Sequence, residues 1–67
     1  MTHIQAYWDG SVTLYTDLDD DDLMQVSRIP GKLMKGEQYN SETVSKEDAR
    51  TEWSQNAANG WKHFPPS

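Results

Sequence analysis

Five aspartates fall within six residues of this chain, at Asp17 and Asp19–Asp22. Carboxylate oxygens are the ligands that Ca²⁺ prefers, so a calcium loop is the first chemistry to test. Counted from Asp17 or from Asp19, the run lacks the central glycine and the glutamate at position twelve that an EF-hand requires. We therefore expect no dedicated metal site, and weak divalent-cation binding stays open as an alternative function.

A dense carboxylate run can also serve as a docking surface. The net charge is −5, and residues 1–27 contain six acids but no lysine or arginine. A negative field attracts basic protein surfaces and repels nucleic acids and anionic membranes. We expect a basic protein surface as the partner, and that partner can itself be a nucleic-acid-binding protein. Direct binding of nucleic acid or membrane is not expected, and a merely solvated charge run is the structural alternative.

Catalytic patterns are missing from the sequence. There is no cysteine, and none of the serines stands in a nucleophile-elbow or Ser-x-x-Lys context. The four glycines punctuate turns and form no phosphate loop. The two histidines, His3 and His63, lie near opposite ends, and we expect them to be satisfied or exposed. The sequence therefore predicts a non-enzymatic protein with no cofactor.

The N-terminal residues predict a β-hairpin with strands over 3–8 and 11–16, because both segments alternate and Asp9-Gly10 joins them. A two-residue loop would split the aliphatic residues between the two faces. A three-residue loop with Gly10 in the left-handed conformation pairs Ala6 with Val12 and Ile4 with Leu14, which gathers all four on one face. We predict this bulged register, because a slip by one residue moves the whole apolar set.

In that register Tyr7 and Tyr15 lie on the face opposite the predicted core. Exposed aromatic residues beside acids are typical of protein-binding hot spots. The predicted partner-binding site accordingly combines aromatic and acidic residues: Tyr7, Trp8, Tyr15, Asp17, Asp19, Asp20, Asp21 and Asp22. The alternative is that another element of the fold covers this face.

The middle of the chain is less regular. A helix over 20–29, capped by Asp19 or Asp20 and stopped by Pro30-Gly31, is favoured over a third strand at 23–29. Residues 32–39 could add a short strand, and residues 40–43 have the composition of a linker.

The C-terminal part predicts a helix over about 46–58. Ser45 is the expected N-cap, Val44 can pack on Ala49, and Asn59-Gly60 ends the helix. Its apolar stripe should press Trp53 onto the aliphatic face of the hairpin. Trp61 and Phe64 should fold back onto the core, and residues 65–67 should form a flexible tail.

The predicted fold class is α+β: an N-terminal antiparallel hairpin, extended or not by a third short strand, packed by one or two helices within a single domain over 1–64. Leu, Ile, Val and Phe make up only ten of the 67 residues, so a homodimer or a partner can be needed to complete the core. Disorder before binding is the competing interpretation.

No stretch of the sequence is long and apolar enough to span a membrane, and the first residues do not form a signal peptide, so we expect a cytoplasmic protein. The expected function is a small acidic protein-binding domain. By analogy of size and charge it would be an inhibitor or accessory protein of the phage or mobile-element type. A self-associating structural subunit is the alternative from another class.

Overall fold

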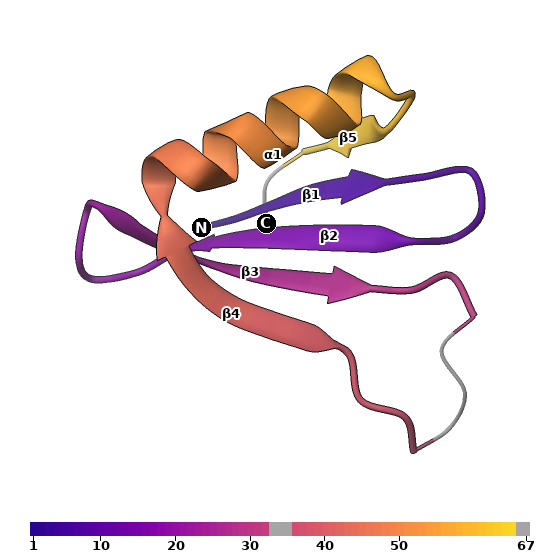
Figure 1. Cartoon of the computed structure of the whole chain (residues 1–67), viewed down its shortest axis with the longest axis horizontal. Coiled ribbons are helices and arrows are strands. Elements are labelled where there is room, and N and C mark those ends of the chain that lie inside the picture. Colours follow the sequence, from indigo (N-terminus) through magenta and orange to yellow (C-terminus); the bar gives the residue numbers. More distant parts are fainter. Residues whose placement is uncertain (33–35, 66–67) are drawn as a thin grey trace.

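Five antiparallel strands form one sheet, and a helix packs across one of its faces (Figure 1). This computed structural model describes residues 1–32 and 36–65. The elements in chain order are β1 (Thr2–Ala6), β2 (Val12–Asp17), β3 (Leu23–Ile29), β4 (Asn40–Ser45), α1 (Lys46–Ala58) and β5 (Lys62–Phe64). The strand order across the sheet is β4-β3-β2-β1-β5. The fold class is therefore α+β, with a larger sheet than the predicted hairpin.

The N-terminal hairpin is confirmed, including its register. Ile4 pairs with Leu14 and Ala6 with Val12, although the strands are Thr2–Ala6 and Val12–Asp17 rather than 3–8 and 11–16. Gly10 has a φ of 92°, and its N–H donates to the Tyr7 carbonyl at 3.0 Å. The Asp9 carboxylate accepts from the Ser11 N–H at 2.8 Å. The turn is thus the predicted three-residue loop, with a left-handed glycine that relieves the strain of a tight reversal.

The prediction of which face the helix covers is wrong. The helix lies on the face that carries Gln5, Thr13 and Tyr15, which are 0%, 2% and 2% exposed. The four aliphatic residues expected in the core, Ile4, Ala6, Val12 and Leu14, lie on the other face and are only half-buried. The polar atoms of Gln5 and Tyr15 on the covered face are paired with groups of the helix, and this pairing makes their burial tolerable.

The predicted helix over 20–29 is also wrong, and the rival strand is correct. Residues Leu23–Ile29 form β3, in which Met24 and Val26 are buried while Gln25 is exposed. This alternation has the two-residue period of a strand. The aspartates form the β2–β3 turn instead of a helical cap: the Asp20 carboxylate accepts from the Asp22 N–H at 2.9 Å.

Strand β4 occupies Asn40–Ser45, where the sequence suggested a linker over 40–43. It pairs with all of β3 except Ile29, from Leu23 opposite Ser45 to Arg28 opposite Asn40. The suggested strand over 32–39 is not formed by residues 36–39, and residues 33–35 lie outside the described part of the chain. Polar residues form this strand because β3 offers it a complete row of backbone partners.

Helix α1 confirms the prediction for 46–58. The Ser45 hydroxyl accepts from the Asp48 N–H at 3.1 Å, as an N-cap should. At the other end Gly60 has a φ of 96°, and the Trp61 N–H donates to the Asn56 carbonyl at 3.0 Å. This is a Schellman ending, and it turns the chain back so that β5 pairs with β1.

The core between α1 and the sheet is small. Its buried apolar residues are Tyr15, Met24, Val26 and Ala49, with Val44 and Trp53 packed against them. Trp53 does not contact the aliphatic face as expected. Its ring stacks on His63 at a centroid distance of 4.4 Å and meets Tyr15 edge-on at 5.2 Å. Of the two aromatic residues expected to fold back, Trp61 stacks on Tyr7 at 5.3 Å, while Phe64 stays 49% exposed.

Candidate functional site

The fold gathers acidic side chains at one end of the sheet. The Lys46 N–H donates to the Asp22 carbonyl at 2.8 Å, which joins the β2–β3 turn to the first turn of α1 (Figure 1). That first turn adds Glu47 and Asp48 to the aspartate run. Seven of the eleven acidic residues therefore share what we call the acidic end: Asp17, Asp19, Asp20, Asp21, Asp22, Glu47 and Asp48.

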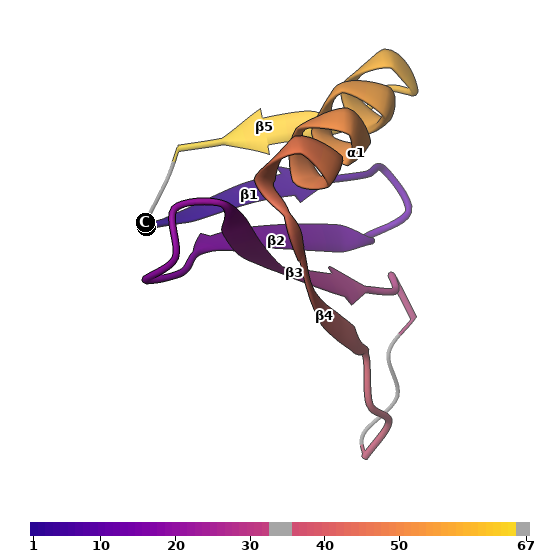
Figure 2. The same ribbon diagram turned by 60° about the vertical axis from the view of Figure 1, so that its left-hand side comes forward.

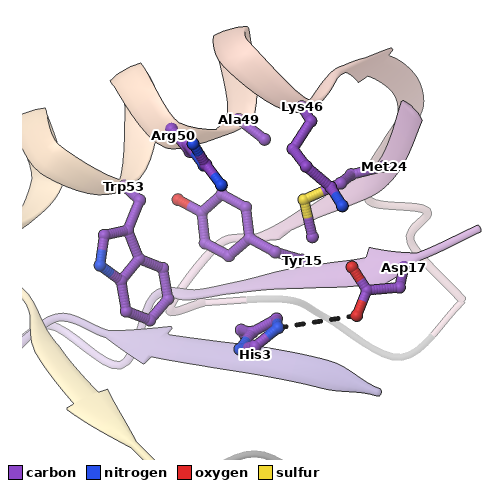
Figure 3. A pocket seen from close by; sticks show the side chains of 8 residues that line it. All are labelled: His3, Tyr15, Asp17, Met24, Lys46, Ala49, Arg50 and Trp53. Atoms are coloured by element: carbon purple, nitrogen blue, oxygen red, sulfur yellow. Dashed lines mark ion pairs between the residues drawn. The ribbon is translucent and has the colours of Figure 1, made fainter. Parts of the chain in front are cut away.

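A groove of about 300 Å³ opens beside the acidic end, between the sheet and the start of α1 (Figure 3). Met24, Ala49 and Tyr15 supply buried apolar surface at its base, and the half-buried Trp53 stands at one end. The complete lining is His3, Tyr15, Asp17, Met24, Lys46, Ala49, Arg50 and Trp53.

The rims of the groove carry opposite charges. On the sheet side, His3 Nε2 lies 3.8 Å from the Asp17 carboxylate, and both side chains are about 40% exposed. On the helix side, Lys46 and Arg50 extend from α1 above the groove (Figure 3). The groove thus offers an apolar base, aromatic rings and one carboxylate to an incoming side chain.

Polar atoms beneath the groove are all paired. The Tyr15 hydroxyl donates to Gln5 Oε1 at 2.8 Å, Asn56 Nδ2 donates to the same oxygen at 3.1 Å, and Gln5 Nε2 donates to the Trp53 carbonyl at 2.9 Å. Burial, with the nearby Glu52 carboxylate, raises the pKa of Tyr15 to about 12. Tyr15 is therefore a neutral hydroxyl that donates to Gln5 within the sheet and accepts from Asn56 Nδ2 of α1 at 3.2 Å, which ties the helix to the sheet.

Arg28 is likewise engaged within the fold. Its guanidinium donates to both carboxylate oxygens of Glu52, at 2.9 and 2.6 Å, and to Glu42 at 3.0 Å. The hydrogen bonds to Glu52 are the main cause that raises the pKa of Arg28 above its usual value. This bidentate contact ties β3 to α1 and β4, so Arg28 acts as a structural clamp.

The structure divides the residues of the predicted site. Asp17 and Asp19–Asp22 lie at the acidic end, whereas Tyr7 and Trp8 belong to the turn at the opposite end of β2 (Figure 1). Trp8 is 84% exposed, and Tyr7 is half-buried between Trp8 and Trp61. The expectation that Tyr15 is exposed is wrong, because its ring is buried under α1 and only borders the groove.

Four residues of this site were not predicted from the sequence. Glu47 and Asp48 belong to the acidic end, and Met24 and Trp53 line the groove. Neither Glu47 nor Asp48 was assigned a binding role from the sequence. A signal was available, because β4 runs directly into α1 without a connecting loop. This signal is informative only if β4 is known to pair with β3, because that pairing brings the start of α1 back to Asp22.

Among residues 1–32 and 36–65, no three His, Asp or Glu side chains are grouped as they would be to hold a metal ion. No helix in this part of the chain is both long and apolar enough to cross a membrane. In comparisons with known proteins, the chain matches no family model, no curated protein and no solved structure.

Proposed function

We propose that this protein is a non-catalytic protein-binding domain that docks its acidic end and the adjoining groove onto a basic site of another protein. The observation that carries the proposal is the joining of two acidic segments, far apart in sequence, next to an apolar groove. Charge steers a partner toward the surface, and an apolar groove gives the bound partner buried contact area. A surface that combines the two can attract a partner and also hold it.

The seven carboxylates of the acidic end outnumber its cations, Lys46 and Arg50. Such an excess speeds the encounter with a positively charged protein and orients it before contact. The partner surface is therefore rich in lysine or arginine, and a nucleic-acid-binding groove is one such surface.

The groove gives the partner an anchor point. A lysine or arginine side chain has an aliphatic stem and a cationic head. The stem fits against Met24 and Ala49, while the head reaches the Asp17 carboxylate. A cation beside this carboxylate gains an ion pair. We propose, by analogy with phage and mobile-element proteins of this size and charge, that it acts in the cytoplasm as an inhibitor or accessory factor.

The test removes charge from the acidic end without touching its turn. Asp19→Asn with Asp21→Asn removes two charges, and among the described residues the side-chain hydrogen bond that holds this turn belongs to Asp20. Immobilised wild type should capture a discrete basic protein from source-cell extract at low salt. After purification of that protein, the double variant should bind it roughly tenfold more weakly, because two long-range attractions are lost.

The matched control removes two charges elsewhere, as Asp9→Asn with Glu37→Gln. The first of these substitutions keeps a side-chain oxygen that can accept from the Ser11 N–H, so the hairpin turn survives. The control should bind like wild type, and both should weaken steeply as salt rises. Capture that resists salt, or equal binding by both double variants, would show that the acidic end is not the docking surface.

A further inference from the structure

The face of the sheet opposite α1, which we call the open face, carries most of the large aliphatic side chains of the molecule. Alternate residues of a strand share a face, and the register aligns Ile4 with Leu14 and Val12 with Ile29. Leu23 shares this face because its neighbour Met24 is buried on the other, and Phe64 pairs with Ile4. Six large apolar side chains therefore gather here: Ile4, Val12, Leu14, Leu23, Ile29 and Phe64.

Within the described residues no helix covers the open face, since α1 lies on the other side of the sheet (Figure 2). Leu14 is at its centre, on the middle strand β2, between Ile4 and Ser27. By comparison, the helix-covered core holds four buried apolar residues. Five of the six side chains of the open face are only half-buried, and Phe64 is 49% exposed. A contiguous apolar patch left in contact with water is a known mark of an interaction site.

The open face carries little charge. Asp17, Arg28 and Glu42 point to the helix side, as the place of Asp17 in the groove and the contacts of Arg28 with Glu42 and Glu52 show. Lys62, opposite Ala6, adds a cation at the β5 edge. The other positions of the open face carry uncharged hydroxyl or amide side chains: Thr2, Thr16, Gln25, Ser27, Ser41 and Thr43. Among the described residues of these strands, no carboxylate lies on the open face to attract a basic partner, whereas a second copy of this acidic chain keeps its carboxylates on other surfaces.

The area suits a pair of small domains. Five strands at a spacing of about 4.8 Å, with three to seven residues each at about 3.4 Å, outline roughly 400 Å² per copy. Side-chain relief makes the accessible area larger than this outline. Two such faces together therefore remove on the order of 1,000 Å² from water, which is the lower range of specific interfaces.

We propose that a second copy of this chain covers the open face, so that two sheets pack face to face with one helix on each outer side. Small residues such as Ser27 and Ala6 alternate with Leu14 and Val12, which lets the two layers interdigitate as in a β-sandwich. The acidic ends stay outside the interface. This inference is independent of the proposed docking function, and a dimer presents two acidic ends.

Sedimentation equilibrium over a wide range of protein concentration tests the proposal. The wild type should be a dimer whose melting temperature rises with concentration. Leu14→Lys should weaken self-association roughly 100-fold or more, because each copy would bury an unpaired ammonium group. The matched control is Ser54→Lys, which adds the same charge at an exposed position of α1 and should leave the dimer unchanged.

Circular dichroism establishes whether Leu14→Lys remains folded. If it does not, Val12→Thr combined with Ile29→Thr decides the question, since threonine keeps the β-branched shape that strands favour. That pair should weaken self-association about tenfold while the fold persists. A monomeric wild type overturns the proposal. The proposal is also overturned if the open-face variants fold and still form the dimer. Self-association would then use another surface, such as the β4 edge.

Discussion

Gln5 has no exposed surface, although glutamine is ordinarily a residue of protein surfaces. Its burial is tolerated because both ends of its amide are bonded: to Tyr15 and Asn56 through Oε1, and to the Trp53 carbonyl through Nε2. Two of these partners, Asn56 and the Trp53 carbonyl, lie 51 and 48 residues away in α1. At the scale of single residues, this network ties α1 to the face of the sheet that carries Gln5 and Tyr15.

Tyr15 gives this network a signature at high pH. Its pKa is raised from 10.0 to about 12 in the folded protein, mainly by burial. The folded state therefore binds more protons than the unfolded chain between these values, and the contribution of Tyr15 to stability is complete below pH 10 and falls as the pH rises toward 12. Tyr15→Phe should lower the free energy of unfolding by about 1 kcal/mol at neutral pH through the lost hydrogen bonds.

Denaturant unfolding at a series of pH values measures this effect. The advantage of wild type over Tyr15→Phe should shrink as the pH rises through 10 to 12. Tyr39→Phe, at a position 46% exposed, is the control and should follow the wild-type curve at every pH. An advantage that stays constant with pH would mean that the Tyr15 hydroxyl is not held neutral by the fold.

At the scale of elements, the sequence predicts well where the signals are local. Ser45, Asp48 and Gly60 mark the two ends of α1, and the helix begins and ends as predicted. Asp9-Gly10 and the alternation around it determine the hairpin register in the same way. Each of these features depends on residues a few positions apart.

Prediction fails where a distant partner decides. Asp20 before Leu23 resembles a helix cap, and only pairing with β2 and β4 makes Leu23–Ile29 a strand. The aliphatic residues Ile4 and Leu14 resemble a core, but the partners of Gln5 and Tyr15 lie some 40 to 50 residues away, in α1. The candidate site follows the same rule: the aspartates were found from sequence, whereas their junction with Glu47 and Asp48 depends on β4.

Two turns meet at Gly31, which follows β3 and approaches the β1–β2 turn. A Cβ at this position would overlap the carbonyl oxygen and carbon of Asp9, both backbone atoms that cannot rotate away. Gly31→Ala should therefore lower the free energy of unfolding by about 2 kcal/mol, an unusual cost for an exposed position.

Urea unfolding measures this cost, with the exposed neighbour Lys32→Ala as the control, which should change stability by less than about 0.5 kcal/mol. Equal stability of the two variants would show that the contact between Gly31 and the Asp9 carbonyl is not maintained in solution.

At the scale of the whole molecule, the negative charge is concentrated at one end. Seven carboxylates at one end repel one another, and only a few cations lie among them. Such a concentration is costly to a domain with a small core, and it is expected where binding rather than folding determines which residues are present. The proposed function and the stability of the chain thus make opposite demands on the acidic end.

This opposition predicts the sign of a stability change. Asp19→Asn with Asp21→Asn should raise the melting temperature in low salt, by about 3 °C, because two mutually repelling charges are removed. Added salt should erase the difference, since screening relieves the same repulsion in the wild type. Differential scanning calorimetry in low and high salt measures both effects, with Asp9→Asn plus Glu37→Gln as the control of equal charge away from the cluster.

A double variant at the acidic end that melts below the wild type would show instead that the aspartates hold the β2–β3 turn together. In that case their role is structural, and the weaker partner binding of the same variant loses its value as evidence for docking.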